Sequence, residues 1–363
     1  MQKGHDGVRA CPYRLPMSTD PGRRKLKRHH HTVPRLLLRR FADGKRIMRV
    51  PLDGSGPKPI GIGDATVRSH FYSMQDATGQ RDDTIENLLA DLENQAARVI
   101  TKIIAEQVWP LSADDRAVLG QWVAAQTARI PAARQANNEI ADQLLKIEIA
   151  AGGKPEVRRR LEAKGEAPVS DEEVDAAWAE LTNFSSYYVE LPVNDHLLSM
   201  AEAMAVAYKW IMVRSWKLCR FKRKTLLLSD HPVTLLRDET EPAWSGVGLA
   251  NAAAIMVPID RRAAIIMTAP DGRDGMFPAS TKVAKELNHR FAWNSRSELF
   301  HHPDDDPVAG IKLPPVRSRE AEFSQTAERF LLPEGPSEAF TSIPTDWPPP
   351  NATAPRRGRD STH

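Results

Sequence analysis

The amino-acid sequence predicts an α+β protein, in which a central helical region (about residues 84–212) packs with a C-terminal, mainly antiparallel sheet. Apolar residues at intervals of three and four indicate the helical region. Short apolar runs of strand length, separated by turn residues between residues 216 and 268, indicate the sheet. A short helix and a short strand are expected ahead of the helical region.

One domain is expected between residues 29 and 332, a length that can bury a substantial core. Residues 1–28 mix glycine, proline and basic residues without periodicity, and residues 333–363 contain seven prolines and few aliphatic residues. Both compositions are typical of disordered segments. Met17 is a second plausible start, so the sequence leaves open whether translation begins at Met1 or at Met17.

The composition argues against a membrane or secreted protein. No run of about 18 apolar residues occurs, and the N-terminus lacks the apolar stretch of a signal peptide. Cys11 and Cys219 are the two cysteines of the chain. Two distant thiols fit a reducing compartment better than a disulfide framework, so a cytoplasmic protein is expected. The sequence gives no indication of the oligomeric state.

The N-terminal elements are predicted from local pattern. Residues 33–41 are apolar with interleaved arginines and suit a short helix. Residues 45–52 alternate as a strand does, after the turn signal Asp43-Gly44. Residues 54–63 are rich in glycine and proline and are expected to open a loop that ends near His70-Phe71-Tyr72.

Helix boundaries in the central region are predicted from capping residues and from proline and glycine. Ser112 followed by Asp115, and Ser170 followed by Glu173, resemble capping boxes. The expected helices run from Thr84 to Pro110, from Ser112 through a kink or break at Pro131 to Gly152, from Ser170 to Leu181, and from Asn194 or Asp195 to Tyr208.

The C-terminal third is predicted to contain strands, a tight corner and one more helix. Residues 254–259 and 263–268 form the clearest hairpin, and Ser229-Asp230-His231-Pro232 form the corner. The other expected elements are strands at 216–221 and 225–228, joined by a basic turn, an extended segment at 233–236 and a helix at 281–293.

Several of these segments resemble a known family. His30-His31-Thr32-Val33-Pro34, followed by Leu38-Arg39-Arg40-Phe41-Ala42, resembles the opening of the family catalogued as domain of unknown function 4238. Members typically begin with His-His-Tyr-Val-Pro-Gln and continue to Leu-Arg-x-Phe. The resemblance continues through Phe71-Tyr72-Ser73, the helix with Glu86 and Glu93, Gln126 with Arg129, Leu228 to Val233, and the following hairpin, so it spans about residues 29–295.

The sequence departs from the family pattern at three positions. Thr32 stands where the family favours an aromatic residue, Arg35 replaces the usual glutamine, and His231 replaces the favoured asparagine. The family name implies no activity. The resemblance therefore marks the matched polar residues as candidates for one shared site and leaves the chemistry open.

His30, His31, Glu86 and Asp230 are the candidate catalytic residues. Histidine can act as a general acid or base near neutral pH, and adjacent histidines on an extended chain point to opposite sides. Asp230 could bind a metal, orient a histidine or act as a base, but Ser and Asp before Pro also commonly form turns. A buried, purely structural histidine is the alternative for His30 and His31.

Glu86 and Glu93 lie seven residues apart and therefore nearly on one side of the predicted helix. Two carboxylates on one face can hold a divalent metal or divide the acid and base roles, while solvated glutamates are the alternative. No cofactor is identified from the sequence, and a divalent metal is left open.

The candidate substrate-binding residues share polar or aromatic side chains in the matched segments: Arg39, Tyr72, Gln126, Arg129, Ser229 and His231. Arg129 is suited to clamp an anion or a phosphate, or to pair with Glu86 or Asp230. Tyr72 could equally be a core aromatic residue.

The first 50 residues carry 14 Lys and Arg against three Asp, although the whole chain has a net charge of only +3. Such a basic segment could bind nucleic acid or another polyanion, or could be a solvated leader.

Two functions remain open on the sequence alone. The first is a hydrolase that acts on a phosphate-bearing or nucleic-acid substrate in a nuclease-like manner. The second is a non-catalytic binding or regulatory protein, in which the His, Asp and Arg residues brace the N-terminal segment against the C-terminal sheet. The sequence contains no GxxxxGK[ST], GxGxxG, GxSxG, HExxH or CxxC motif, which disfavours several common enzyme classes.

Overall fold

The computed structural model describes residues 28–332, apart from residues 77, 164, 166–167, 241, 243–245, 271–272, 322 and 324–325. Within this part of the chain the predicted α+β class is confirmed. The predicted leader (except Arg28) and the predicted tail lie outside the described residues. None of the described helices combines the length and apolarity needed to cross a membrane.

The elements follow one another in the order strand, helix, small strands, helices, and then strands again. The helices are α1 (Arg35–Arg40), α2 (Thr84–Ile104), α3 (Ala113–Ala128), α4 (Pro131–Glu162), α5 (Asp171–Leu181), α6 (Val193–Met212), α7 (Thr281–Asn294) and α8 (Ala327–Phe330). The strands are β1 (His29–His31), β2 (Arg46–Pro51), β3 (Lys58–Gly61), β4 (Val67–Ser69), β5 (Met74–Gln75), β6 (Arg81–Asp82), β7 (Ser215–Arg220), β8 (Leu228–Ser229), β9 (Thr234–Leu236), β10 (Ala254–Asp260), β11 (Ala263–Thr268), β12 (Gly275–Met276) and β13 (Glu298–His301).

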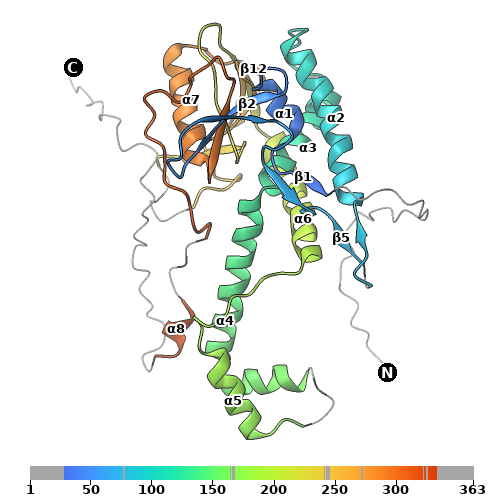
Figure 1. The fold of residues 1–363 in the computed structure, drawn as a ribbon, viewed down its shortest axis with the longest axis vertical. Coiled ribbons are helices and arrows are strands. Elements are labelled where there is room, and N and C mark those ends of the chain that lie inside the picture. The colour runs from blue at the N-terminus through green and yellow to red at the C-terminus, as the bar shows by residue number, and fades with distance from the viewer. Residues whose placement is uncertain are drawn as a thin grey trace, which may run out of the picture.

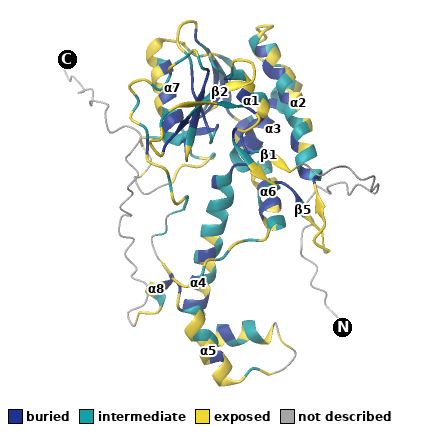
Figure 2. Ribbon diagram, in the orientation of Figure 1, coloured by how far each residue is buried: buried dark blue, intermediate teal, exposed yellow. Residues whose placement is uncertain are grey.

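The two larger sheets gather in one part of the molecule, with α7 on one side and α2 on the other, while α4 and α5 project as an arm (Figure 1). The arm has its own small apolar cluster, built around Ile149, Val157 and Val174. The main core lies between the sheets and the helices α1, α2, α3, α6 and α7. Figure 2 shows the contrast between the buried strands and the more exposed arm.

The five-stranded sheet has the order β12-β7-β11-β10-β9 and contains the predicted hairpin. β10 and β11 pair antiparallel, with Ile255 opposite Met267. In both strands every residue except the last is buried. Burial of successive residues means that both faces of the sheet are covered, which explains the continuous apolar runs in the sequence.

The four-stranded sheet has the order β3-β2-β13-β8 and so pairs strands from early and late parts of the described chain. Phe300 of β13 lies opposite Arg49 of β2 on one side and opposite Leu228 of β8 on the other. The prediction of a loop from residue 54 to about residues 70–72 is wrong in part, because β3 pairs there with β2 and β4 pairs with β1. β1 pairs separately with β4, with His30 opposite Arg68.

The expectation of joined strands at residues 216–221 and 225–228 also needs correction. β7 lies in the five-stranded sheet, and β8 begins only at Leu228 and lies in the four-stranded sheet. The chain crosses between the sheets at Leu227, whose N–H donates to Asn288 Oδ1 of α7 at 3.0 Å. A side chain of a helix thus satisfies the backbone group that a neighbouring strand would otherwise bind.

Two helix starts agree with the capping residues. The hydroxyl of Ser112 accepts from the N–H of Asp115, and Ser170 forms a reciprocal capping box with Glu173. The predicted cap at Asn194 or Asp195 is wrong, because α6 begins at Val193 and the side chain of Asn194 binds the backbone of Gln75 instead.

One further helix boundary differs from the prediction, because α2 ends at Ile104, well before Pro110. The predicted kink or break at Pro131 is a break, since α3 ends at Ala128 and Pro131 is the first residue of α4. The predicted stop at Gly152-Gly153 agrees with the structure: Gly153, with φ of +64°, is non-helical, and a second helical stretch of α4 follows it up to Glu162. Packing against α5 maintains the second half of the helix beyond this glycine.

Candidate functional site

A cavity of about 590 Å³ lies where β1, the start of α1, the loop before β4 and α2 meet. It is called the His31 cavity below and is lined by His29, His31, Arg35, Gly63, Asp64, Val67, Glu86, Ala90, Glu93 and Arg129. Three of the predicted site residues, His31, Glu86 and Arg129, therefore line one cavity.

Side chains along β1 point alternately to opposite sides of the strand, and this decides which histidines face the cavity. His29 and His31 line it, whereas His30 between them is fully buried. This is the arrangement expected of an extended chain, in which residues i and i+2 share one side. Val67 of β4, the residue paired with His31, lines the cavity as well.

The ring of His31 is held in one orientation by the backbone. Its Nδ1 lies 2.9 Å from the carbonyl oxygen of Ala65. A carbonyl oxygen only accepts hydrogen bonds, so Nδ1 must carry the proton. In the neutral ring Nε2 is then the basic nitrogen. This is the tautomer that a general base requires.

The pKa of His31 lies below its ordinary value of 6.5. Burial, which disfavours the imidazolium ion, is the largest cause, and the nearby cations Arg35 and Arg129 act in the same direction. The Ala65 hydrogen bond and Glu93 oppose this shift without cancelling it. His31 is therefore mostly neutral at pH 7.

The loop that carries Ala65 is fixed by its neighbour Thr66. Thr66 has φ of +57°, a left-handed conformation that is strained for a β-branched residue. Its carbonyl accepts from the N–H of Thr32 at 3.0 Å and from the Thr32 hydroxyl at 3.1 Å, and its hydroxyl exchanges hydrogen bonds of 3.3 Å with the backbone of Val33. These bonds hold the strained residue in place and so keep the Ala65 carbonyl against His31.

Arg129, the residue after α3, connects the cavity to the core. Its side chain is 2% exposed, and it donates to Glu93 at 2.5 Å, to the carbonyl of His31 at 2.8 Å and to the Tyr72 hydroxyl at 3.3 Å. A guanidinium has five N–H groups, so two remain without a partner in the described part of the chain. Arg129 can therefore stabilise the site and still donate to a bound anion.

One face of α2 supplies the acidic wall. Glu86, Ala90 and Glu93 are spaced by four and three residues, so they follow one another along the helix surface, and all three line the cavity. Glu93 is balanced by Arg129. Both predicted carboxylates therefore face the cavity, and the charge of Glu93 is paired with that of Arg129.

Arg35 and Asp64 are exposed residues of the cavity lining. Arg35 is the first residue of α1 and makes no ion pair within the described ranges. Arg39 lies one helical turn further along and is exposed too, outside the cavity lining. A positive charge at the mouth and mixed charges inside characterise this site.

His30, Tyr72 and Gln126 are buried next to the cavity and are not part of its lining. The Tyr72 N–H donates to His30 Nδ1 at 2.8 Å, and the two rings stack in parallel with centroids 5.5 Å apart. The Tyr72 hydroxyl donates to the carbonyl of Arg129 at 2.6 Å. Gln126 donates to the carbonyl of Trp122 at 3.1 Å, one turn back in α3. His30 and Tyr72 therefore support the site through β1 and Arg129, whereas the bond of Gln126 stays within α3.

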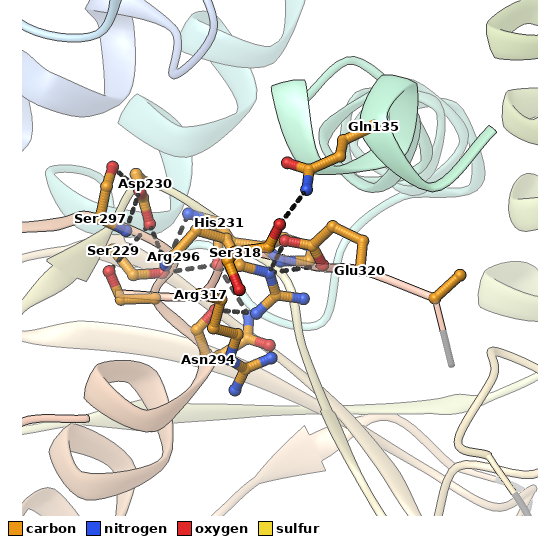
Figure 3. A network of polar contacts seen from close by, with 12 residues as sticks. Gln135, Ser229, Asp230, His231, Asn294, Arg296, Ser297, Arg317, Ser318 and Glu320 are labelled. Carbon is orange, nitrogen blue, oxygen red and sulfur yellow. Dashed lines mark hydrogen bonds and ion pairs between the residues drawn. The ribbon is translucent and has the colours of Figure 1, made fainter. Parts of the chain in front are cut away.

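The segment Ser229-Asp230-His231-Pro232, called the β8 corner below, forms a different structure (Figure 3). Asp230 Oδ1 accepts from the Ser295 hydroxyl and the Arg296 N–H, both at 2.8 Å. Its Oδ2 accepts from the Ser297 N–H at 2.8 Å, from the Ser297 hydroxyl at 2.7 Å and from the Glu298 N–H at 3.3 Å. Asp230 therefore fixes the turn between α7 and β13, and it does not line the His31 cavity.

Ser229 and His231 complete the same corner. The Ser229 hydroxyl donates to the carbonyl of His231 at 2.5 Å and accepts from its N–H at 3.2 Å, a local turn of the predicted kind. The pKa of His231 lies well below 6.5 because the ring is buried and faces the cations Arg296 and Arg317. Neither residue lines the His31 cavity.

Residues 317–320, called the C-terminal strap below, lie beside this corner, as Figure 3 shows. Arg317 donates to the carbonyl of Trp293 at 2.7 Å, and Arg296 pairs with Glu320 at 2.7 Å. Gln135 of α4 donates to the carbonyl of Ser318 at 2.8 Å. The β8 corner is thus held between α7, β13, the strap and α4.

A family model described as "Protein of unknown function (DUF4238)" matches residues 29–305. The chain belongs to this family. The matched region begins with the first residue of β1 and includes both the His31 cavity and the β8 corner. No curated protein and no solved structure matches the chain.

Membership of the family assigns no activity to any residue, so the candidate site is argued from the geometry of its residues alone. His29, Arg35 and Asp64 were absent from the predicted site. The i and i+2 spacing of His29 and His31 could have revealed the first, whereas Asp64 lies in a segment expected to be a plain loop. Within the described residues no group of three or more His, Cys, Asp or Glu is placed to hold a metal ion.

Proposed function

We propose that this protein is a hydrolase that cleaves a phosphodiester bond in the His31 cavity, with His31 as the general base. The observation that supports this most directly is the hydrogen bond from His31 Nδ1 to the Ala65 carbonyl. It leaves Nε2 as the basic nitrogen in a ring whose pKa is lowered, within a cavity that also contains Arg35 and Arg129. A neutral, oriented imidazole is the form that removes a proton from an attacking hydroxyl group.

The two arginines are suited to the phosphate. The remaining N–H groups of Arg129 and the side chain of Arg35 can donate to phosphate oxygens and stabilise the charge that builds up on them during the reaction. Glu86 faces the same cavity and is a further candidate for proton transfer.

The charges of the cavity favour a phosphodiester over a polyphosphate. The cavity lining contains the carboxylates of Asp64, Glu86 and Glu93 and the guanidinium groups of Arg35 and Arg129, and Glu93 pairs with Arg129. A triphosphate would bring several more negative charges into this mixture, whereas a phosphodiester brings one. The volume of about 590 Å³ lies within the usual range for small-molecule sites, about 300–1,000 Å³.

A non-catalytic binding or regulatory protein is the second candidate. It is favoured by His30 and Asp230, since the first is packed against Tyr72 and the second accepts five hydrogen bonds. Under this alternative these residues only brace the N-terminal segment and the C-terminal sheet, and the cavity binds a ligand without reacting with it.

Hydrolysis of bis(p-nitrophenyl) phosphate and of single-stranded DNA and RNA by the purified full chain tests the proposal. Replacement His31→Gln should lower kcat/KM about 10²–10⁴-fold, the usual contribution of a general base, with little change in Tm. The control His289→Gln alters an exposed histidine of α7 and should retain full activity. Absence of cleavage by the wild-type chain, or an active His31→Gln variant, would favour the binding alternative.

A further inference from the structure

We propose that the substrate is single-stranded RNA and that the attacking group is the RNA's own 2′-hydroxyl, with His31 as the base and His29 as the acid. This inference rests on the phosphodiester cleavage with His31 as the base that is proposed above. It specifies the substrate and makes the 2′-hydroxyl, in place of water, the attacking group. It comes from the presence of two histidines on the same side of one short strand.

The spacing of the two histidines fits an in-line displacement at phosphorus. Residues i and i+2 of a strand lie about 7 Å apart, because a strand rises about 3.3–3.4 Å per residue. In such a displacement the attacking and leaving oxygens lie on opposite sides of the phosphorus. A base and an acid must then be separated by one phosphodiester group and two hydrogen bonds, a distance of similar size.

The surroundings of the two rings differ in the sense that the reaction requires. His31 is half-buried, and its Nδ1–H is engaged by the Ala65 carbonyl. His29 is exposed and makes no hydrogen bond to any other described residue through its ring. The ring of His31 is held with Nε2 as the acceptor and suits the base, whereas the exposed ring of His29 is open to the leaving oxygen and suits the acid.

The reaction balances without a co-reactant. His31 Nε2 takes the proton of the 2′-hydroxyl, the 2′-oxygen forms a bond to phosphorus, and the bond from phosphorus to the 5′-oxygen breaks. The leaving 5′-oxygen takes a proton from His29. The products are a 2′,3′-cyclic phosphate and a 5′-hydroxyl, and exchange with water restores both histidines.

Two exposed arginines of α1 lie in or near the cavity and are suited to bind the RNA backbone. Arg35 lines the cavity, and Arg39 lies one turn away on the exposed side of α1. Both side chains can bind neighbouring phosphates, which gives salt-dependent affinity without sequence preference. A single-stranded substrate is required because the 2′-oxygen must rotate into line with the leaving oxygen, which a regular helix prevents.

The test uses the full chain and a 5′-labelled single-stranded RNA in buffer with EDTA. A second RNA carries one 2′-deoxynucleotide, and single-stranded DNA of the same sequence is the third substrate. We expect cleavage of the RNA, resistance of the bond that follows the deoxynucleotide, and no cleavage of DNA. The new ends should be a 2′,3′-cyclic phosphate and a 5′-hydroxyl.

The roles of the two histidines can be separated with a substrate whose 5′-bridging oxygen is sulfur. A thiolate leaves without protonation, so this RNA should restore cleavage by His29→Ala and should not restore cleavage by His31→Ala. With ordinary RNA both variants should lose about 10²–10⁴-fold in rate, and His289→Gln should lose none.

The outcomes distinguish this inference from the proposed function. Cleavage of DNA and RNA at similar rates, loss of activity in EDTA, or products with a 5′-phosphate would overturn the 2′-hydroxyl mechanism and leave the phosphodiesterase intact. Failure of sulfur to restore His29→Ala would remove His29 as the acid. No cleavage of any phosphodiester would overturn both proposals.

Discussion

The His31 cavity and the β8 corner begin from similar sequence signals and differ in how their polar groups are used. Each contains histidine beside apolar strand residues, and each lies in the matched family region. In the β8 corner the carboxylate of Asp230 accepts five hydrogen bonds from residues 295–298. In the His31 cavity, by contrast, the imidazole uses one ring nitrogen for support and Arg129 retains two N–H groups within the described part of the chain. A polar side chain whose hydrogen-bonding groups are all bound within the protein stabilises the fold. One that keeps a free donor or acceptor can also bind a ligand.

The largest expected effect tests this contrast through stability. Asp230→Ala should lower the free energy of unfolding by about 2–3 kcal/mol, because the Arg296 and Ser297 N–H groups lose a charged acceptor. His31→Ala should cost less than about 1 kcal/mol, since it removes one hydrogen bond to a carbonyl. Urea unfolding of both variants measures the difference. Equal losses, or a larger loss for His31→Ala, would break the comparison.

The pH dependence of stability gives an intermediate effect. His231 has a pKa well below 6.5 when folded, so the unfolded chain takes up a proton that the folded chain refuses as the pH falls below 6.5. Stability is therefore complete above pH 6.5 and decreases below it, by at most about 1.4 kcal/mol per pH unit for one group. His31 contributes in the same direction, since its pKa is lowered as well.

Replacement His231→Asn, which removes the titrating ring and keeps a polar side chain, should remove most of this slope between pH 6.5 and pH 5. The measurement is urea unfolding at several pH values, with His289→Asn as the exposed control. An unchanged slope in His231→Asn would show that the β8 corner does not account for the acid sensitivity.

The smallest effect concerns Tyr72, which lies behind the cavity. Tyr72→Phe removes the hydroxyl that donates to the Arg129 carbonyl, and it should cost about 1 kcal/mol of stability. Because the hydroxyl touches Arg129 and not the cavity, kcat/KM should change less than about tenfold, equivalent to about 1.4 kcal/mol. A loss of kcat/KM as large as that of His31→Gln would show that the Tyr72 hydroxyl takes part in the reaction itself.

Local pattern was sufficient for several parts of the structure. The β10–β11 hairpin, the caps at Ser112 and Ser170, and the opposite orientations of His30 and His31 agree with the sequence prediction. Each depends on residues close together in the chain, where periodicity and capping chemistry act directly.

Tertiary structure decided which distant residues meet. Glu93 pairs with Arg129 across 36 positions, and Asp64 enters the cavity from a segment that sequence pattern leaves as a loop. β8 joins a sheet with β2 and β13 and not with β7, since pairing depends on which edge each strand reaches.

The sequence by itself therefore determined the α+β class, the family and the polar residues from which a site could be built. Only the folded chain decided that Asp230 would be saturated by the turn after α7 while His31 would face a cavity. The physical reason is that hydrogen-bond capacity is a property of residue type, but its use depends on neighbours that are brought together by long-range packing.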